Sequence, residues 1–162
     1  MRTIRTAALD DLNIITEVEA LCFPPSEAAN SEQFAERLKH YAEHFLLMFE
    51  NGRLVSFVDG FVTDERDLTD EMYENAAMHN EKGKWQMLFG VNTIPEYRRQ
   101  GCAGELIRRF IDTAKEQGRL GVVLTCKERL IEYYEKFGFM NEGLTEKSTH
   151  GGAEWYQMRL TF

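Results

Sequence analysis

The chain has 162 residues and a formal net charge of −8, which suits one domain with a sizeable core and disfavours general nucleic-acid binding. Hydrophobic residues make up 43% of it and charged residues 28%, with no apolar run that could span a membrane and no basic-then-apolar leader, so we expect a single cytoplasmic domain over residues 1–162. The three cysteines, Cys22, Cys102 and Cys126, lack paired spacing, which argues for reduced thiols and against a disulfide framework or a zinc ribbon.

A short strand at Ile4 and two helices are predicted for the first quarter of the chain. Apolar residues recur at helical spacing across residues 9–22, behind two aspartates that suit a helix N-terminus. Two prolines in segment 23–30 end this helix. An asparagine and a glutamine three residues apart then form a capping pair for a second helix from residue 30 to about residue 43.

For the next quarter of the chain, the sequence predicts an antiparallel hairpin followed by an acidic segment. Apolar runs 45–49 and 54–62 flank Asn51-Gly52, a strong hairpin signal. Segment 63–83 is mostly polar, and we expect a helix in it whose few apolar side chains lean on the body. Its favoured interpretation is a solvated insertion, and the alternative is a flap over a substrate.

For the second half of the chain, the sequence predicts alternating strands and helices. Residues 84–91 form a strand that ends before Pro95. A helix over 105–117, a buried strand over 122–126, a helix over 129–137 and a strand over 154–160 follow. Together with the hairpin, this order predicts an α/β fold with a central, mixed and mostly antiparallel sheet, one parallel crossover and flanking helices.

A loop of small residues with two arginines enters the helix over 105–117 directly from a strand. Such a loop points free backbone N–H groups and the positive end of a helix dipole at one place, which favours phosphate. An ordinary strand-to-helix turn is the alternative. The residues in question are Arg98, Arg99, Gln100, Gly101, Cys102, Ala103 and Gly104.

The pattern Arg98-x-x-Gly101-x-Ala103 resembles the pyrophosphate-binding motif of the GNAT superfamily of acyl-CoA N-acyltransferases. Segments 50–57, 64–69 and 126–139 are similar to the arylalkylamine N-acetyltransferase group, and the similarity runs from about residue 45 to residue 139. The resemblance implies a GNAT-type fold and acetyl-CoA as cosubstrate, without a metal. It also implies that the loop binds the pyrophosphate and that Val91, Asn92 and Thr93 line the thioester arm, with a main-chain N–H near Val91 or Asn92 as oxyanion donor.

The same resemblance implies catalytic residues. It places the acid that protonates the leaving thiolate at Tyr134, although helical spacing alone does not separate it from Tyr133. Two histidines that often remove the amine proton in this group correspond to Met87 and Phe89 here. Segment 23–30 is similar to a loop of the insect enzymes that carries a glutamate base, which makes Glu27 the expected base, and a solvated glutamate is the alternative.

Other reactive side chains carry weaker hypotheses. His40 and His44 lie four residues apart on a helix, and a surface pair is a better interpretation than a metal site because no third ligand is in view. Cys102 has no base nearby in sequence and is not expected to act as a nucleophile. Four methionines, Met72, Met78, Met87 and Met140, are expected to fill gaps in the core.

The leading hypothesis is an acetyl-CoA-dependent N-acetyltransferase that acts on a small primary amine. The resemblance favours a hydrophobic or aromatic amine, and the net acidity keeps a polyamine open. The rival hypothesis is a non-catalytic CoA-binding module that serves as a regulator or subunit, and a protein-directed acetyltransferase is a third. We expect no nucleic-acid or membrane partner, and the sequence leaves a homodimer open.

Overall fold

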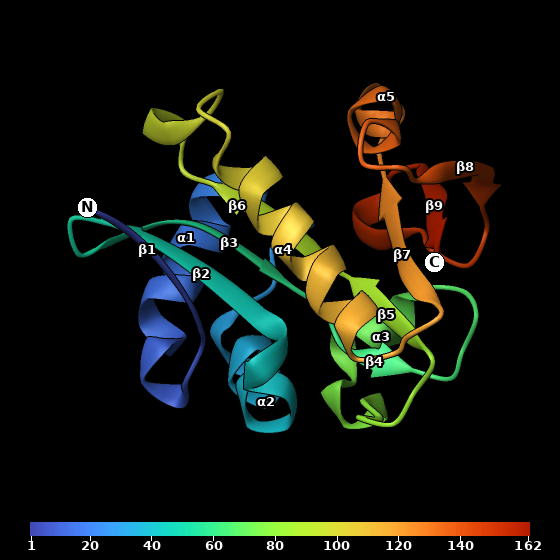
Figure 1. Ribbon diagram of the computed structural model, residues 1–162, viewed down its shortest axis with the longest axis horizontal. Coiled ribbons are helices and arrows are strands. Elements are labelled where there is room, and N and C mark those ends of the chain that lie inside the picture. Colours follow the sequence, from blue (N-terminus) through green and yellow to red (C-terminus); the bar gives the residue numbers. More distant parts are fainter.

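The computed structural model describes residues 1–162 and contains two β-sheets (Figure 1). One is an antiparallel sheet in the order β1 (Arg2–Thr6), β2 (Phe45–Glu50), β3 (Arg53–Asp59) and β6 (Gly90–Thr93). The other has the order β4 (Val62–Thr63), β5 (Trp85–Leu88), β7 (Gly121–Cys126), β9 (Trp155–Thr161) and β8 (Met140–Thr145). Its β5–β7 pair is parallel and confirms the predicted crossover.

The two sheets separate at Phe89. The prediction of one strand over 84–91 is wrong, because β5 and β6 are consecutive in the chain but pair in different sheets. An apolar run can reveal that both halves are extended, but not which strand each half bonds to. At the same level β3 passes into β4 through Gly60, where an added Cβ would lie 1.9 Å from the carbonyl oxygen of Met87. The main chains at Gly60 and Met87 therefore approach each other too closely for a residue with a Cβ atom at position 60.

Helices cover the strands. The first predicted helix is a 3-10 turn, η1 (Leu9–Asp11), continuing into α1 (Leu12–Cys22), and the second is α2 (Ser31–Tyr41), followed by η2 (Ala42–His44). The capping box of Asn30 and Gln33 is confirmed, with bonds of 2.9 and 2.8 Å. Helix α4 (Cys102–Glu116) packs against β3, β6 and β7 and crosses in front of the strands in Figure 1.

Segment 63–83 is anchored to the body by its apolar side chains, as predicted, while most of its charged side chains are exposed. It contains α3 (Asp70–Glu74) and η3 (Ala76–Met78), and both Leu68 and Met72 are buried. The buried guanidinium of Arg37 donates to the carbonyl oxygen of Tyr73 at 3.0 Å. The apolar side chains of the segment are therefore part of the core, as expected.

The remaining elements complete one end of the molecule. They are η4 (Pro95–Tyr97), η5 (Glu128–Leu130), α5 (Ile131–Glu135) and η6 (His150–Gly152).

Strand β8 was not predicted, because it is a mostly exposed edge strand without an apolar pattern, and Met140 on it is exposed instead of filling the core. A cluster of 34 buried apolar residues spans both sheets. None of the helices is long and apolar enough to cross a bilayer.

Candidate active site

A pocket of about 170 Å³ opens where the two sheets separate. β5 pairs with β7 as far as Leu88 and Leu124, and beyond that point β6 turns away to pair with β3. In Figure 1 the loop before α4 and helix α5 lie at the same upper end of the molecule, beyond β6 and β7. The lining includes Glu19, Cys22, Phe23, Glu27, Arg37, Tyr73, Phe89, Gly90, Val91, Thr125, Lys127, Tyr134, His150 and Trp155.

Tyr134, the expected acid, is a buried residue of α5 that lines this pocket. Burial raises the pKa of its phenol above the ordinary value, and no hydrogen bond contributes to the shift. Its neighbour Tyr133 is half-buried, does not line the pocket, and packs edge-on against Tyr134 and Phe137. The structure thus separates two tyrosines that helical spacing left equivalent, and Tyr134 is the one with access to the pocket.

Glu27, the expected base, also lines the pocket. Its Oε2 lies 2.8 Å from Nζ of Lys127, at the end of β7, and its carboxylate side chain is only 9% exposed. His150 bonds through Nε2 to the main-chain oxygen of Glu27 at 2.7 Å. The alternative of a solvated glutamate is therefore wrong, because this carboxylate is enclosed by residues from three separate parts of the chain.

Aromatic side chains from distant segments form one side of the pocket. Tyr73 of α3 stacks on His150 with ring centroids 4.8 Å apart, and its hydroxyl bonds Thr125 Oγ1 at 3.0 Å. Burial raises the pKa of Tyr73 to about 12. The indole of Trp155 donates to the carbonyl oxygen of His150 at 2.7 Å. No sequence motif predicted these residues, since they come from α3, η6 and β9, whose relative positions depend on long-range packing.

A buried charged cluster lies behind the same pocket. Nη1 of Arg37 contacts Oδ2 of Asp59 at 3.1 Å, and both side chains are at most 5% exposed. Glu19 of α1 accepts a hydrogen bond from the main-chain N–H of Ala29 at 3.0 Å. Burial, reinforced by the negative charge of Asp59, raises the pKa of Glu19 to about 7. Sequence inspection missed this group, although a glutamate on the apolar face of α1 was a usable signal.

The loop before α4 has the geometry of an anion site. Arg99 and Gly101 have φ angles of 63° and 80°, which turn successive backbone N–H groups toward one side. The first bond at the start of α4 runs from Glu105 N to the carbonyl oxygen of Gly101 at 3.1 Å, so the three amides from Cys102 to Gly104 precede the helical hydrogen-bond ladder. These donors fit a pyrophosphate.

Residues around the loop fix its place relative to the pocket. Arg98 donates through Nε to the carbonyl oxygen of Thr93 at 3.0 Å, which ties the loop to the end of β6. Val91 lines the pocket, whereas Asn92 is fully buried and is not among the lining residues. Cys102 is also buried, in line with the expectation that it is not a nucleophile. All three cysteines are free, as predicted.

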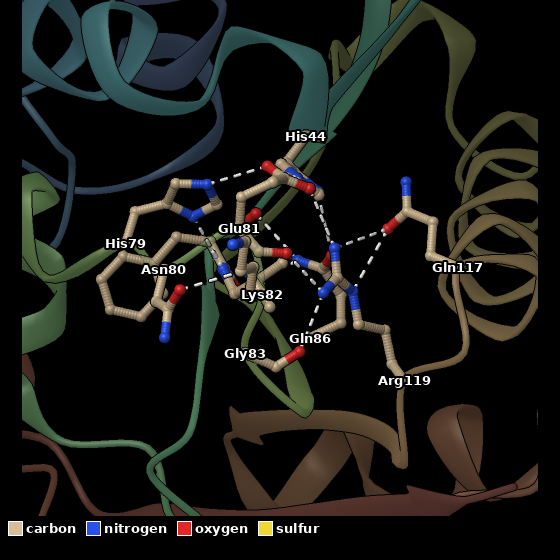
Figure 2. A network of polar contacts seen from close by, with 12 residues as sticks. His44, His79, Asn80, Glu81, Lys82, Gly83, Gln86, Gln117 and Arg119 are labelled. Atoms are coloured by element: carbon tan, nitrogen blue, oxygen red, sulfur yellow. Dashed lines mark hydrogen bonds and ion pairs between the residues drawn. The ribbon is translucent and has the colours of Figure 1, made fainter.

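A second polar cluster lies at η2 and the segment before β5, outside the pocket (Figure 2). His44 is buried and does not form a surface pair with His40, because its Nε2 lies 2.9 Å from Glu81. His79 Nε2 lies 3.0 Å from the same carboxylate. Nη2 of Arg119 contacts the same carboxylate at 2.9 Å, and the ligand atoms of His44, His79 and Glu81 lie within 4.8 Å of one another.

Known proteins share this architecture. A model of the acetyltransferase (GNAT) family matches residues 12–139. Serotonin N-acetyltransferase from Mesocricetus auratus is 30% identical over 115 residues, covering 68% of this chain and 54% of that protein. The chain thus spans about half the length of the curated relatives it matches. This relative confirms the resemblance to the arylalkylamine group.

Solved structures agree on the fold. The loading GNATL domain of CurA from Lyngbya majuscula has a TM-score of 0.86 at 16% identity, with 99% of this chain and 98% of that chain covered. PaiA N-acetyltransferase from Thermoplasma acidophilum in complex with coenzyme A has a TM-score of 0.74 at 15% identity, with 100% and 99% covered. Because the family model matches most of the chain, including α1, the anion loop and α5, the protein belongs to the acetyltransferase (GNAT) family.

Proposed function

We propose that the protein transfers the acetyl group of acetyl-CoA to a small primary amine that carries a hydrophobic or aromatic group. The observation that supports this most is the position of the pocket. It lies at the separation of β6 from β7, with Tyr134 on its wall, and Arg98 ties the anion loop to the strand that borders it. A cosubstrate with pyrophosphate on the loop amides can extend its acyl end along Val91 into this space.

Tyr134 is the proposed acid. Acetyl-CoA supplies an activated acyl carbon and a thiolate leaving group that needs a proton. A phenol with an ordinary pKa of about 10 can protonate a thiolate of pKa about 8.5 at a cost of about 2 kcal/mol. Burial raises the pKa of Tyr134, which keeps the phenol protonated at neutral pH but makes its proton transfer costlier than that of an ordinary phenol.

Glu27 is proposed to bind the ammonium group of the amine substrate. Its carboxylate is enclosed at the pocket wall, and its negative charge is balanced by the ion pair with Lys127. A substrate ammonium group can replace the lysine as partner of this carboxylate, because both are cations of the same kind. Around it, Tyr73, His150 and Trp155 offer aromatic surface, which suits an aryl group better than the extended chain of a polyamine.

A panel of amines tests the proposal. The protein is mixed with acetyl-CoA and with phenylethylamine, an indole-ethylamine, a linear alkylamine, a polyamine or a short peptide, and free thiol is followed. The aromatic amines should give the highest kcat/KM. Peptide as the preferred acceptor would overturn the substrate class.

A non-catalytic CoA-binding module is the second candidate. The positions of the group's two strand histidines are occupied by Met87, which is fully buried, and by Phe89, which lines the pocket. Tight CoA binding without thiol release from acetyl-CoA in the presence of any of these amines would favour this candidate over catalysis.

A further inference from the structure

One carboxylate of the pocket remains without a role. We propose that Glu19 of α1 is the general base of the reaction and accepts the proton of the bound ammonium group beside Gly90. This inference rests on the proposed function and deepens it. It assigns binding of the amine to Glu27 and acceptance of its proton to Glu19.

The charges of the cluster favour one additional proton. Arg37 supplies one buried cation, whereas Asp59 and Glu19 supply two buried carboxylates. Asp59 holds Arg37 at 3.1 Å, whereas Glu19 accepts a hydrogen bond from the N–H of Ala29 and forms no ion pair. With both carboxylates ionised the cluster carries an uncompensated buried negative charge, and one proton on Glu19 removes it. The pKa of about 7 at Glu19 agrees with this charge balance.

The unpaired polar atoms converge on one point. Oε1 of Glu19, Oδ1 of Asp59 and both amide atoms of Asn92 are buried without a hydrogen-bond partner. A Cβ built on Gly90 would lie 2.9 Å from Oδ1 of Asp59, 3.2 Å from Nδ2 of Asn92 and 3.8 Å from Oε1 of Glu19. Unpaired buried acceptors are destabilising, and a proton on Glu19 provides the missing donor. The arrangement is therefore suited to gain and release one proton.

The cluster and the proposed acid line the pocket from different elements. Glu19, Gly90 and Val91 line the pocket from α1 and β6, whereas Tyr134 lines it from α5, which follows β7. A group held in the pocket therefore lies among residues of both parts, with Glu19 contributed by α1 and Tyr134 by α5. The thiol of Cys22, three residues further along α1, also interacts with Glu19, and burial raises its pKa.

The proton balance follows from these positions. The ammonium group gives one proton to Glu19, and the neutral nitrogen then forms a bond to the acetyl carbon while the C–S bond breaks. The thiolate takes a proton from Tyr134, and the second proton lost by the nitrogen restores the phenol. Glu19 returns its proton to solvent, so each turnover releases one proton overall. Glu19 is needed because roughly one alkylamine molecule in a thousand is neutral at pH 7.

The test compares Glu19→Gln with Glu17→Gln, an exposed glutamate two residues earlier on the same helix. Two acceptors are used, phenylethylamine and its β,β-difluorinated analogue, whose amine is far less basic and needs no base. Glu19→Gln should lower kcat at pH 7 by about 100-fold or more with phenylethylamine, and by less than about fivefold with the fluorinated amine. Glu17→Gln should match the parent protein with both.

Equal losses with the two amines, in a variant that is folded and binds CoA, would show that Glu19 only supports the fold. Unchanged turnover would overturn the proposal outright. If Glu19→Gln does not fold, the parent protein decides, since its kcat/KM with phenylethylamine should fall below about pH 7 as Glu19 becomes protonated, and a profile without this fall would overturn the assignment. Failure of the proposed function is distinct, because the parent protein would then release no thiol at all.

Discussion

Nζ of Lys127 lies 2.8 Å from Oε2 of Glu27, so the end of β7 is joined to the loop between α1 and α2 across the wall of the pocket. One hundred residues separate the two in sequence. The pair shows that a cationic group is accommodated at this point. A substrate ammonium group that took the place of Nζ would enter an environment already arranged for positive charge.

Glu27→Gln is expected to raise KM for a primary amine about tenfold and to change kcat by less than about threefold, because one charge-assisted bond of about 1.4 kcal/mol is lost. Steady-state kinetics with phenylethylamine measure both constants. Glu32→Gln, at an exposed position of α2, is the matched control and should leave KM unchanged. If KM does not respond in Glu27→Gln, the carboxylate only holds Lys127.

Tyr134→Phe should lower kcat by about 10²-fold while CoA affinity is retained, because the ring keeps its packing and only the proton donor is removed. Free-thiol release gives the rate, and calorimetry with CoA gives the affinity. Tyr133→Phe removes a hydroxyl from the adjacent residue outside the pocket and should be near the parent in both. Equal rates for the two variants would remove Tyr134 from the mechanism.

Gly101→Ala should weaken CoA binding about tenfold. The residue has a φ of 80°, which costs a residue with a side chain about 1–2 kcal/mol, and relief of this strain would turn the loop amides away from the phosphates. Gly118→Ala is the control, since Gly118 has a φ of 81° and equally open surroundings but lies beyond the other end of α4. CoA titrations of both variants decide, and equal affinities would refute the loop as the pyrophosphate site.

Stability should depend on pH through Glu19. Its pKa is about 7 in the folded chain and 4.5 as a free side chain, so between these values the native state binds more protons than the unfolded state. Its contribution is therefore fully present below about pH 4.5 and is lost as pH rises through 7, by about 3 kcal/mol. The free energy of unfolding of the parent protein and of Glu19→Gln is measured with denaturant at pH 5 and pH 8. Relative to the parent protein, the variant should be more stable at pH 8 than at pH 5. A constant difference would mean that Glu19 is not protonated in the native state.

Local signals in the sequence determined much of the fold. The hairpin at Asn51-Gly52 and the capping box of Asn30 and Gln33 depend on neighbouring residues alone, and both are found as predicted. The break at Phe89 depends on which strands flank it, and no local pattern encodes that choice.

The candidate site also combines a part that is local in sequence with a part that depends on tertiary packing. The anion loop is one contiguous segment, so its geometry follows from its own glycine and the start of α4. The pocket wall needs Tyr73, His150 and Trp155 to come together from α3, η6 and β9, which only tertiary packing brings about. Glu19 is an intermediate case, because it shares the buried face of α1 with Ile15 and Val18, and a carboxylate at such a position signals a special environment.

Acetyl transfer itself is tested most directly by following free thiol and N-acetylated amine together, by colorimetry and mass spectrometry, during incubation of the protein with acetyl-CoA and phenylethylamine. The account predicts one N-acetyl product for each thiol released, at a rate that Tyr134→Phe lowers by about 10²-fold. CoA binding without any N-acetyl product above the protein-free reaction would contradict it.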